Sequence, residues 1–280
     1  AYGKINLALD VLGKRDNGYH DVRMIMQTVG LHDRIELYRT KEPGIRLETN
    51  LFYLPNNEQN LAYRAAALLI EEFGVKEGVS IQLKKFIPVS AGMAGGSTDA
   101  AAVLFGVNKM FGLGLSIKEL MERGVKLGAD IPYCLMRGTA LSEGIGEKLS
   151  TIPAMPSCYI LIAKPNIHVS TKWVYTNLVL DEHTNHPDID GMLASMKKRD
   201  LLSLSNQIGN VLESVTIPAY PQIAAIKECM LQNGALGSLM SGSGPTVFGI
   251  FDDKDKAMAA KEKCRELPYR CFVFVTDLYR

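Results

Sequence analysis

A glycine-rich loop between a predicted strand and a predicted helix constrains this chain more than any other feature. The pattern predicts a strand over Val79–Ile87 and a helix over Thr98–Phe111. This order of elements places unpaired backbone N–H groups and the positive end of a helix dipole around one small concavity. Such a concavity suits phosphate, because the N–H groups donate hydrogen bonds and the dipole favours an anion. The segment reads Pro88-Val89-Ser90-Ala91-Gly92-Met93-Ala94-Gly95-Gly96-Ser97-Thr98-Asp99.

The spacing of the glycines limits the kind of phosphate loop. It fits neither Gly-x-x-x-x-Gly-Lys-Ser/Thr nor Gly-x-Gly-x-x-Gly, so a loop of another type is predicted. The side chains of Ser97, Thr98 and Asp99 can cap helix amides and offer oxygen ligands to a phosphate-bound magnesium ion. The alternative is a flexible connection without a ligand, which this polar helix start disfavours.

Composition and charge exclude several classes of partner. The 280 residues carry a net charge of +1, which favours neither nucleic acid nor an anionic membrane surface. No apolar run is long enough to span a bilayer, and Ala1–Leu7 does not have the pattern of a signal peptide. The five cysteines form neither a disulfide framework nor a zinc pattern. We therefore expect free thiols, a cytoplasmic location, and no nucleic-acid or membrane partner.

The first half of the chain has a mixed α/β pattern. Strands are predicted over Lys4–Leu12, Met24–Leu31 and Asp33–Tyr38. Asn60 is a good N-cap for a helix over Leu61–Phe73, and Ser116 with Glu119 forms a capping box that opens another helix, to about Leu127.

A proline-flanked connection, Pro153–Pro156, predicts a boundary between domains 1–152 and 153–280. The second half predicts an α+β domain with helices on one face of an antiparallel sheet. Its predicted strands are Tyr159–Ala163, Thr246–Phe251 and Cys271–Thr276, and its predicted helices are Arg199–Val211, Tyr220–Gln232 and Lys254–Arg265.

Three further segments accompany the glycine-rich loop: Lys4–Leu7 followed by Arg15–His20, Leu127–Pro132, and the small-residue loop Leu239–Thr246. Together, in this order, the four segments resemble the GHMP kinase superfamily, which includes galactokinase, homoserine kinase, mevalonate kinase and phosphomevalonate kinase. The resemblance implies a two-domain α+β GHMP kinase fold. Its N-terminal domain is α/β and similar to domain 2 of ribosomal protein S5, its C-terminal domain is ferredoxin-like, and the active site lies in the cleft between them.

Within the superfamily, Gly3–Leu7, Asp16–His20 and Gly128–Pro132 are most similar to one branch. Members of that branch use ATP and Mg²⁺ to phosphorylate the 2-hydroxyl of 4-diphosphocytidyl-2-C-methyl-D-erythritol, in the non-mevalonate isoprenoid pathway. The resemblance thus implies ATP and a cytidine diphosphate sugar-alcohol as substrates, with a monomer or homodimer as the assembly. Ala91 and Ala94 depart from the pattern, because that loop is often richer in glycine.

Two other functions stay open. One is a GHMP kinase of the homoserine or phosphomevalonate type, which Tyr19 and His20 disfavour because those substrates have no ring to stack. The other is a catalytically silent nucleotide-binding regulator, which Lys4 and Asp130 disfavour because such a protein needs no base.

The resemblance assigns catalysis to two residues. Asp130 would be the general base that accepts the proton of the substrate hydroxyl, and Lys4 would lie beside it and stabilise the developing negative charge. The alternatives are an aspartate that caps a helix and a solvated lysine on an edge strand.

The resemblance also divides the binding residues between the substrates. Tyr19 would stack on cytosine, His20 would hydrogen-bond its edge, and Tyr175 would flank the ring. Alternatively, Tyr19 and His20 simply follow a turn, and Tyr175 packs in the core. The other assigned residues are Asn6 and Thr171 for the substrate; Pro88, Val89, Ser90, Ala91, Gly92, Met93, Ala94, Gly95, Gly96, Ser97, Thr98, Asn60, Lys85, Ser241, Gly242, Ser243 and Gly244 for ATP; and Ser97 as a candidate Mg²⁺ ligand. The alternatives are an N-cap for Asn60, a solvated side chain for Lys85, and a hairpin or bulge for Ser241–Thr246.

Overall fold

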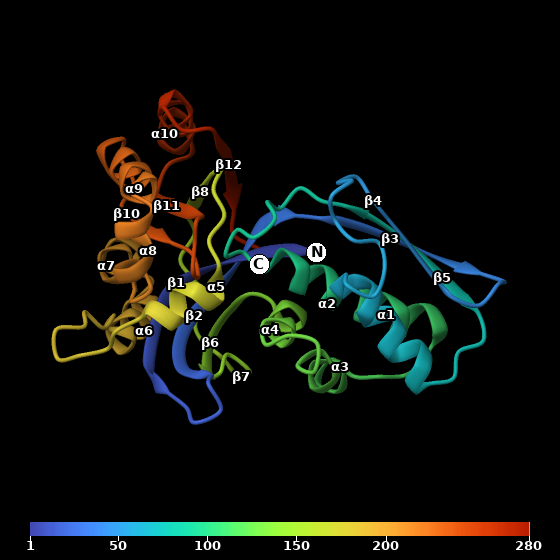
Figure 1. Cartoon of the computed structure of the whole chain (residues 1–280). Coiled ribbons are helices and arrows are strands. Elements are labelled where there is room, and N and C mark those ends of the chain that lie inside the picture. The colour runs from blue at the N-terminus through green and yellow to red at the C-terminus, as the bar shows by residue number, and fades with distance from the viewer. Residues whose placement is uncertain (280) are drawn as a thin grey trace. The chain divides into compact units, whose positions relative to one another are not determined.

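The computed structural model describes residues 1–279, which form two compact units (Figure 1). Unit 1 contains Ala1–Gly3, Leu31–Val89 and Ala94–Arg137. Unit 2 contains Lys4–Gly30, Ser90–Met93 and the chain from Gly138 onward. Each unit is thus assembled from several chain segments, whereas the sequence analysis divided the chain once, between residues 152 and 153. That boundary stays a prediction.

Unit 1 is built on a three-stranded sheet of order β3-β5-β4, in which β5 runs antiparallel to β3 and parallel to β4. Helices α1 and α2 pack together beside this sheet, and α3 and α4 pack against α2. The elements are β3 (Arg34–Thr40), β4 (Ile45–Thr49), α1 (Leu61–Glu72), β5 (Gly78–Lys84), α2 (Gly95–Phe111), α3 (Ile117–Gly124) and α4 (Ile131–Met136).

Local capping explains where two of these helices begin. The Asn60 side chain accepts a hydrogen bond from Ala62 N at 2.9 Å, which fixes the start of α1. Ser116 and Glu119 form a reciprocal capping box at the start of α3. Both caps were predicted, and both are confirmed.

Unit 2 contains most of a five-stranded sheet of order β7-β6-β2-β1-β9. Strand β2 is antiparallel to β6, and β1 pairs in parallel with the short strand β9. The strands are β1 (Tyr2–Lys14), β2 (His20–His32), β6 (Thr139–Gly144), β7 (Lys148–Thr151) and β9 (Gly209–Asn210). Strand β1 lies between β2 and β9, and its residues from Gly3 to Val11 are buried.

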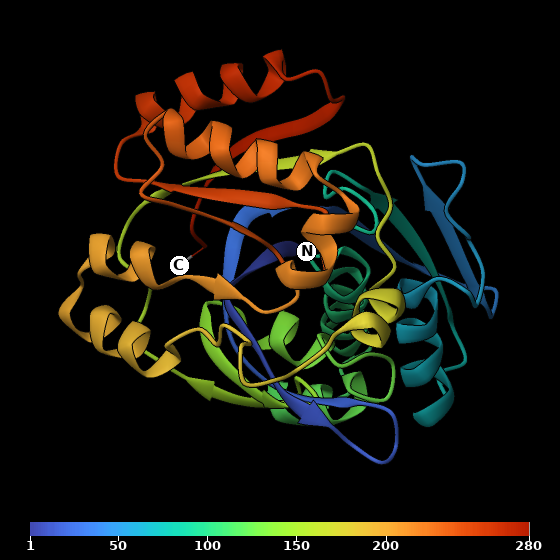
Figure 2. The same cartoon turned by 60° about the vertical axis from the view of Figure 1, so that its left-hand side comes forward.

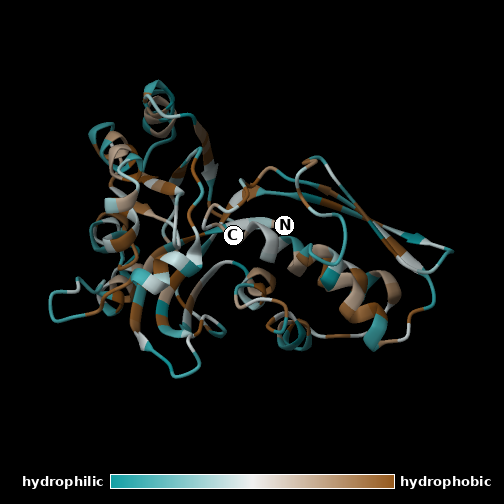
Figure 3. Cartoon of the chain, viewed as in Figure 1, coloured by the Kyte–Doolittle hydropathy of each residue, from teal (hydrophilic) through white to brown (hydrophobic). Residues whose placement is uncertain are grey.

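Unit 2 also contains an antiparallel four-stranded sheet of order β10-β11-β8-β12. Helices α9 and α10 lie side by side on one face of this sheet, as predicted (Figure 2). In Figure 3 the outer helix α10 is largely hydrophilic, whereas β11 is apolar and fully buried. The elements are β8 (Tyr159–Pro165), α9 (Gln222–Gln232), β10 (Gly237–Met240), β11 (Val247–Phe251), α10 (Lys254–Glu266) and β12 (Cys271–Asp277).

The helix predicted over Arg199–Val211 is wrong. Arg199 has a left-handed backbone (φ 55°) that ends the preceding helix, and the side chain of Asp200 caps a new one. A helix of seven residues follows, and the chain then extends into β9. The helices of this region are α5 (Thr171–Asn177), α6 (Ile189–Lys198), α7 (Leu201–Gln207) and α8 (Glu213–Ala219).

The predicted bounds around the first glycine loop also need correction. Strand β5 ends at Lys84 instead of Ile87, and α2 begins at Gly95 instead of Thr98. The N-cap of α2 is Ala94, and it makes no side-chain capping bond. Ser97, Thr98 and Asp99 therefore lie inside the helix and do not cap it. Within residues 1–279, none of the helices combines the length and apolar character needed to cross a membrane.

Candidate active site

The first glycine loop (Pro88–Thr98) has a backbone suited to anions. Ser90, Gly92 and Ala94 have positive φ values of 52°, 70° and 55°, whereas the residues between them do not. Such an alternation of backbone hand is the local pattern by which successive N–H groups form anion-binding concavities in proteins. The two non-glycine positions are strained, which is common where a backbone is shaped for a ligand.

The start of α2 adds unpaired donors to this loop. The first helical hydrogen bond runs from Thr98 N to Ala94 O at 2.8 Å, so the N–H groups of Gly95, Gly96 and Ser97 have no partner within the helix. Gly96 is exposed and Ser97 is half-buried, so this helix start is open to solvent. At the other end of the loop, Pro88 and Val89 are half-buried, and Ala91 and Met93 are buried.

Residues from three predicted motifs meet within unit 2. The buried Lys4 ammonium donates a hydrogen bond to Asn6 Oδ1 at 2.6 Å, and Asn6 N donates to Ser241 Oγ at 3.3 Å. Ser241 Oγ in turn donates to the carbonyl oxygen of Gly92 at 3.0 Å. A side chain at Gly92 would collide with the Ser241 carbonyl oxygen, so this approach of the two loops requires glycine. The structure therefore joins the N-terminal strand and both glycine loops.

The C-terminal glycine loop (Ser241–Gly244) is held by residues that the sequence analysis missed. Asn210 donates to the carbonyl oxygens of Met240 and Gly242, both at 2.8 Å, and accepts from Leu212 N at 3.0 Å. The sequence gives no signal for this support, because the two carbonyl groups that Asn210 binds lie about thirty residues further along the chain.

Lys85 does not have the solvated side chain that was its alternative interpretation. Lys85 is 7% exposed, and its ammonium donates to Asp99 Oδ2 at 2.6 Å and to Asp33 Oδ2. Asp99 is thus held as an ion-pair partner, and its side chain is buried instead of facing solvent at the helix start. Burial raises the pKa of Asp99 to about 7, opposed by Lys85 and reinforced by the negative charge of Asp33. The predicted contact of Lys85 with the nucleotide stays a prediction.

Asp130 occupies the N-cap position of α4, but its carboxylate makes no capping bond. The interpretation of Asp130 as an ordinary helix cap is therefore not supported. The Asp130 side chain is half-buried, and the turn that carries it approaches α2: a Cβ placed on Gly128 would lie 4.0 Å from Ser97 Oγ. Lys4 belongs to the other unit, and its pairing with Asp130 stays a prediction.

Asn60 has the capping role that was its alternative interpretation. Besides accepting from Ala62 N, its amide donates to the carbonyl oxygen of Pro55 at 2.9 Å. Both ends of the side chain are therefore used by the chain itself. The nucleotide contact predicted for Asn60 is not tested by these bonds.

The structure groups two residues predicted to bind cytidine. The rings of His20 and Tyr175 lie 5.1 Å apart at an interplanar angle of 39°. Burial lowers the pKa of His20, and the charge of Lys14 lowers it further, so the imidazole is neutral at neutral pH. Tyr19 follows a turn with Gly18 at φ 84°, and its side chain is 59% exposed. Thr171 Oγ1 and Ser243 Oγ share a hydrogen bond of 2.7 Å.

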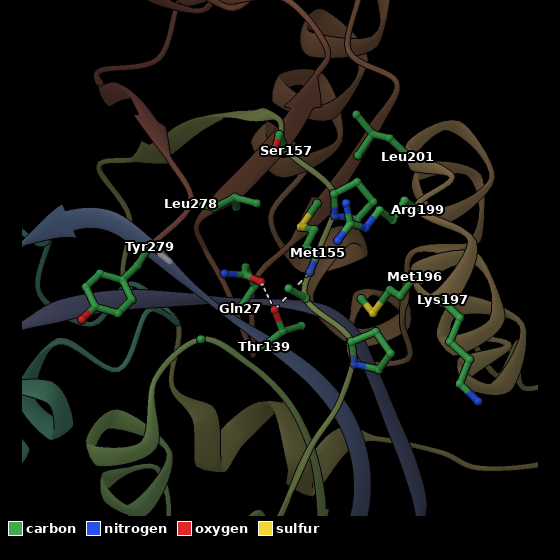
Figure 4. A pocket seen from close by; sticks show the side chains of 14 residues that line it. Gln27, Thr139, Met155, Ser157, Met196, Lys197, Arg199, Leu201, Leu278 and Tyr279 are labelled. Atoms are coloured by element: carbon green, nitrogen blue, oxygen red, sulfur yellow. Dashed lines mark hydrogen bonds between the residues drawn. The ribbon is translucent and has the colours of Figure 1, made fainter.

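A cavity of about 990 Å³ opens elsewhere in unit 2 (Figure 4). Its wall is tied together by Thr139, whose hydroxyl donates to Gln27 at 2.7 Å and accepts from Met155 N at 3.2 Å. Met196, Arg199 and Leu278 are among its other lining residues. None of the predicted phosphate or substrate residues lines this cavity.

Sequence profiles of the GHMP kinase N-terminal domain and of the GHMP kinase C-terminal region match residues 60–138 and 192–270. Two bacterial relatives bear the name 4-diphosphocytidyl-2-C-methyl-D-erythritol kinase. The protein of Lachnoclostridium phytofermentans is 56% identical over 279 residues, covering 100% of this chain and 96% of the relative. The protein of Lachnospira eligens is 54% identical, with coverage of 100% and 97%.

Solved structures agree with these sequence relatives. A crystal structure of 4-(cytidine 5'-diphospho)-2C-methyl-D-erythritol kinase superposes with a TM-score of 0.85 at 30% identity, covering 100% of this chain and 98% of that one. A homoserine kinase of Cytophaga hutchinsonii shares the fold at a TM-score of 0.79 and 20% identity, covering 91% of this chain and 89% of its own. The chain belongs to the GHMP kinase family, and its sequence relatives are the 4-diphosphocytidyl-2-C-methyl-D-erythritol kinases of that family.

Proposed function

We propose that this chain transfers the γ-phosphoryl group of ATP to the 2-hydroxyl of 4-diphosphocytidyl-2-C-methyl-D-erythritol. The observation that supports phosphoryl transfer is the alternating backbone of Ser90, Gly92 and Ala94, which leads into the free amides of the α2 start. The substrate is proposed from the names of relatives more than 50% identical to this chain.

Asp130 is proposed as the general base. Its carboxylate makes no bond to the amides of α4, so its oxygens can accept a proton. In the reaction the hydroxyl proton moves to Asp130 while the hydroxyl oxygen bonds to the γ-phosphorus. The bond from that phosphorus to the bridging oxygen breaks, and ADP leaves.

Lys4 is proposed to stabilise the charge that develops on the attacking oxygen. Its ammonium has three N–H donors, and the 2.6 Å bond to Asn6 uses one of them. A buried ammonium oriented by a neighbouring amide needs little reorganisation when negative charge develops nearby. Asn6 thereby orients Lys4, besides its proposed contact with the methylerythritol hydroxyls.

The cytidine contacts are proposed for Tyr19, His20 and Tyr175. The exposed ring of Tyr19 is available to stack on cytosine, and the neutral His20 beside Tyr175 can exchange hydrogen bonds with the edge of the base. Thr171 is proposed to contribute to the same substrate through its hydroxyl.

Magnesium is proposed to accompany ATP, with Ser97 as a candidate protein ligand. The Ser97 hydroxyl lies in the first turn of α2, half-buried, facing the turn before Asp130. A hydroxyl together with phosphate oxygens and waters suits Mg²⁺, which retains water and seldom needs an all-protein cage. The bound ion would neutralise charge on the phosphates. Residues 1–279 contain no group of three or more His, Cys, Asp or Glu arranged for a metal.

The test is ADP release measured with ATP and each of three alcohols: 4-diphosphocytidyl-2-C-methyl-D-erythritol, homoserine and phosphomevalonate. We expect turnover with the first alone. Turnover with either of the others would assign the chain to another GHMP activity. ATP binding without turnover of any alcohol would indicate a silent regulator.

The Tyr19→Ala variant tests the cytidine contact separately. Loss of one stacking contact weakens binding by about 1–3 kcal/mol, so the KM for the cytidylylated substrate rises about ten- to a hundredfold while the KM for ATP hardly changes. Equal changes in both KM values, or in neither, would remove Tyr19 from the substrate site.

A further inference from the structure

A cluster of three buried charged side chains lies against the start of α2 in unit 1. It consists of Asp33 between β2 and β3, Lys85 directly after β5, and Asp99 inside α2. They are 1%, 7% and 3% exposed. Buried charges are costly to maintain, so a cluster of three calls for a physical explanation.

Hydrogen bonds fix this cluster from several sides. Asp33 Oδ1 accepts from the backbone N–H groups of Phe86 and Ile87, at 2.5 and 2.8 Å. The backbone of Lys85 is bound on both sides by the Asn50 side chain, which accepts at 2.8 Å and donates at 3.2 Å. The segment that enters the first glycine loop is therefore held rigidly up to Ile87.

The Lys85 ammonium connects this hydrogen-bonded segment to helix α2. It binds Asp33 and Asp99 together, so it joins the end of β5 to the second turn of the helix. It also lies under the helix start, because a Cβ placed on Gly95 would be only 3.3 Å from Lys85 Nζ. The first residue of α2 thus lies close to the Lys85 ammonium.

The same geometry argues against a direct bond from Lys85 to the nucleotide. If the ammonium turned toward a ligand, both buried carboxylates would lose their cation. Asp33 would keep only its backbone donors, and Asp99 Oδ1 already has no partner within the described chain. Leaving buried charges unpaired is strongly unfavourable. The geometry therefore favours retention of both ion pairs of Lys85 when ATP binds, over the nucleotide contact predicted for it.

We propose that Asp33, Lys85 and Asp99 are positioning residues that hold the α2 start in the geometry that receives the phosphates of ATP. The inference rests on the proposed function only in taking the nucleotide phosphates as the ligand of this helix start. It assigns these three residues no contact with ATP or with the alcohol.

The experiment compares Asp99→Asn and Lys85→Met with the native chain, and Lys84→Met is the matched control because Lys84 is the exposed neighbour of Lys85. The affinity of each folded variant for a non-hydrolysable ATP analogue is measured by calorimetry, and kcat and both KM values are measured by ADP release. We expect Asp99→Asn and Lys85→Met to weaken nucleotide binding about ten- to a hundredfold, since displacements near 1 Å have effects of that size. In these two variants the KM for the alcohol should change less than about threefold. In Lys84→Met the nucleotide affinity, kcat and both KM values should all stay within about threefold of native.

Asp99→Asn separates positioning from direct binding. It preserves side-chain shape and an acceptor for Lys85, so it also carries the test if Lys85→Met does not fold. Positioning predicts weaker nucleotide binding in Asp99→Asn, and a double variant no worse than Lys85→Met because the two residues act through one another. Direct binding by Lys85 predicts unchanged or tighter nucleotide binding in Asp99→Asn, since Lys85 is then released.

Unchanged nucleotide affinity in folded Asp99→Asn would overturn the proposal. So would a fall in kcat with no change in nucleotide affinity. Because binding of the ATP analogue requires no alcohol, these outcomes are independent of the substrate assignment. That assignment fails instead if the native chain binds the analogue but does not phosphorylate the cytidylylated alcohol.

Discussion

The start of α2 and the C-terminal glycine loop are both small-residue segments, but the chain supports them by different chemistry. Beneath the α2 start lie three buried charges, Asp33, Lys85 and Asp99. Residues Ser241–Gly244 of the C-terminal glycine loop are held by neutral groups, chiefly the amide of Asn210 and the hydroxyl of Ser241, while the Glu213 carboxylate accepts from the preceding Met240 N. The charged cluster holds its residues in one arrangement, but removal of any one charged side chain leaves a buried charge without its partner. Removal of one neutral group around the C-terminal glycine loop breaks only the hydrogen bonds of that group and leaves no unpaired charge.

The largest effect is expected for Asp130, which belongs to neither of these two supports. Its substitution should change turnover without changing ATP affinity. Asp130→Asn should lower turnover about 10²–10⁴-fold, the range typical of a general base, while ATP affinity stays near the native value. Single-turnover kinetics and calorimetry measure the two quantities. Native turnover in the variant would remove Asp130 from the mechanism, and lost ATP affinity would show that Asp130 supports the loops.

The charged support should be the more sensitive of the two to a single change. Lys85→Met should lower the free energy of unfolding by about 3–5 kcal/mol, because it leaves Asp33 and Asp99 buried without a cation. Denaturant unfolding measures this, with Lys84→Met as the control that should stay within about 0.5 kcal/mol of native. A loss below about 1 kcal/mol would mean that water or a proton replaces the ammonium easily.

The neutral support should fail more mildly. Asn210→Ala leaves the carbonyl oxygens of Met240 and Gly242 without their donor, at a cost of about 1–3 kcal/mol. Asn210→Asp keeps the acceptor for Leu212 N but places a buried carboxylate oxygen against the two carbonyl oxygens, so it should cost more than Asn210→Ala. If Asn210→Ala were as damaging as Lys85→Met, the contrast between charged and neutral support would be lost.

The smallest effect is a change in how stability depends on pH. The pKa of Asp99 is raised from 3.8 to about 7, so the folded chain holds a proton that the unfolded chain releases between these values. Native stability therefore falls as pH rises from about 4 to about 7, and Asp99→Asn lacks this loss.

Thermal unfolding checks this prediction. The melting temperature of Asp99→Asn minus that of the native chain should increase by a few degrees between about pH 5.5 and about pH 8. Asp16→Asn, at an exposed turn position, is the control and should follow the native curve. If the melting temperatures of Asp99→Asn and of the native chain changed equally with pH, the pKa of Asp99 in the folded chain would be near its ordinary value.

The sequence by itself determined features whose partners lie close along the chain. The caps at Asn60 and Ser116 were predictable because a side chain bonds a backbone N–H group two or three residues away. The first glycine loop was predictable because left-handed backbone and close approach both favour small residues. The kinase family followed from four such local motifs read in order.

Only the tertiary structure decided the environment of each site residue. Lys85 is 52 positions from Asp33, and Asn210 is 30 from Met240, so no local pattern distinguishes them from a surface lysine or a turn asparagine. The helix predicted over Arg199–Val211 failed for a related reason, since Gly209 and Asn210 pair with β1 some two hundred positions away. Local backbone preferences differ by about 1 kcal/mol or less per residue, whereas unpaired buried charges and polar groups cost several times more, so long-range pairing outweighs them.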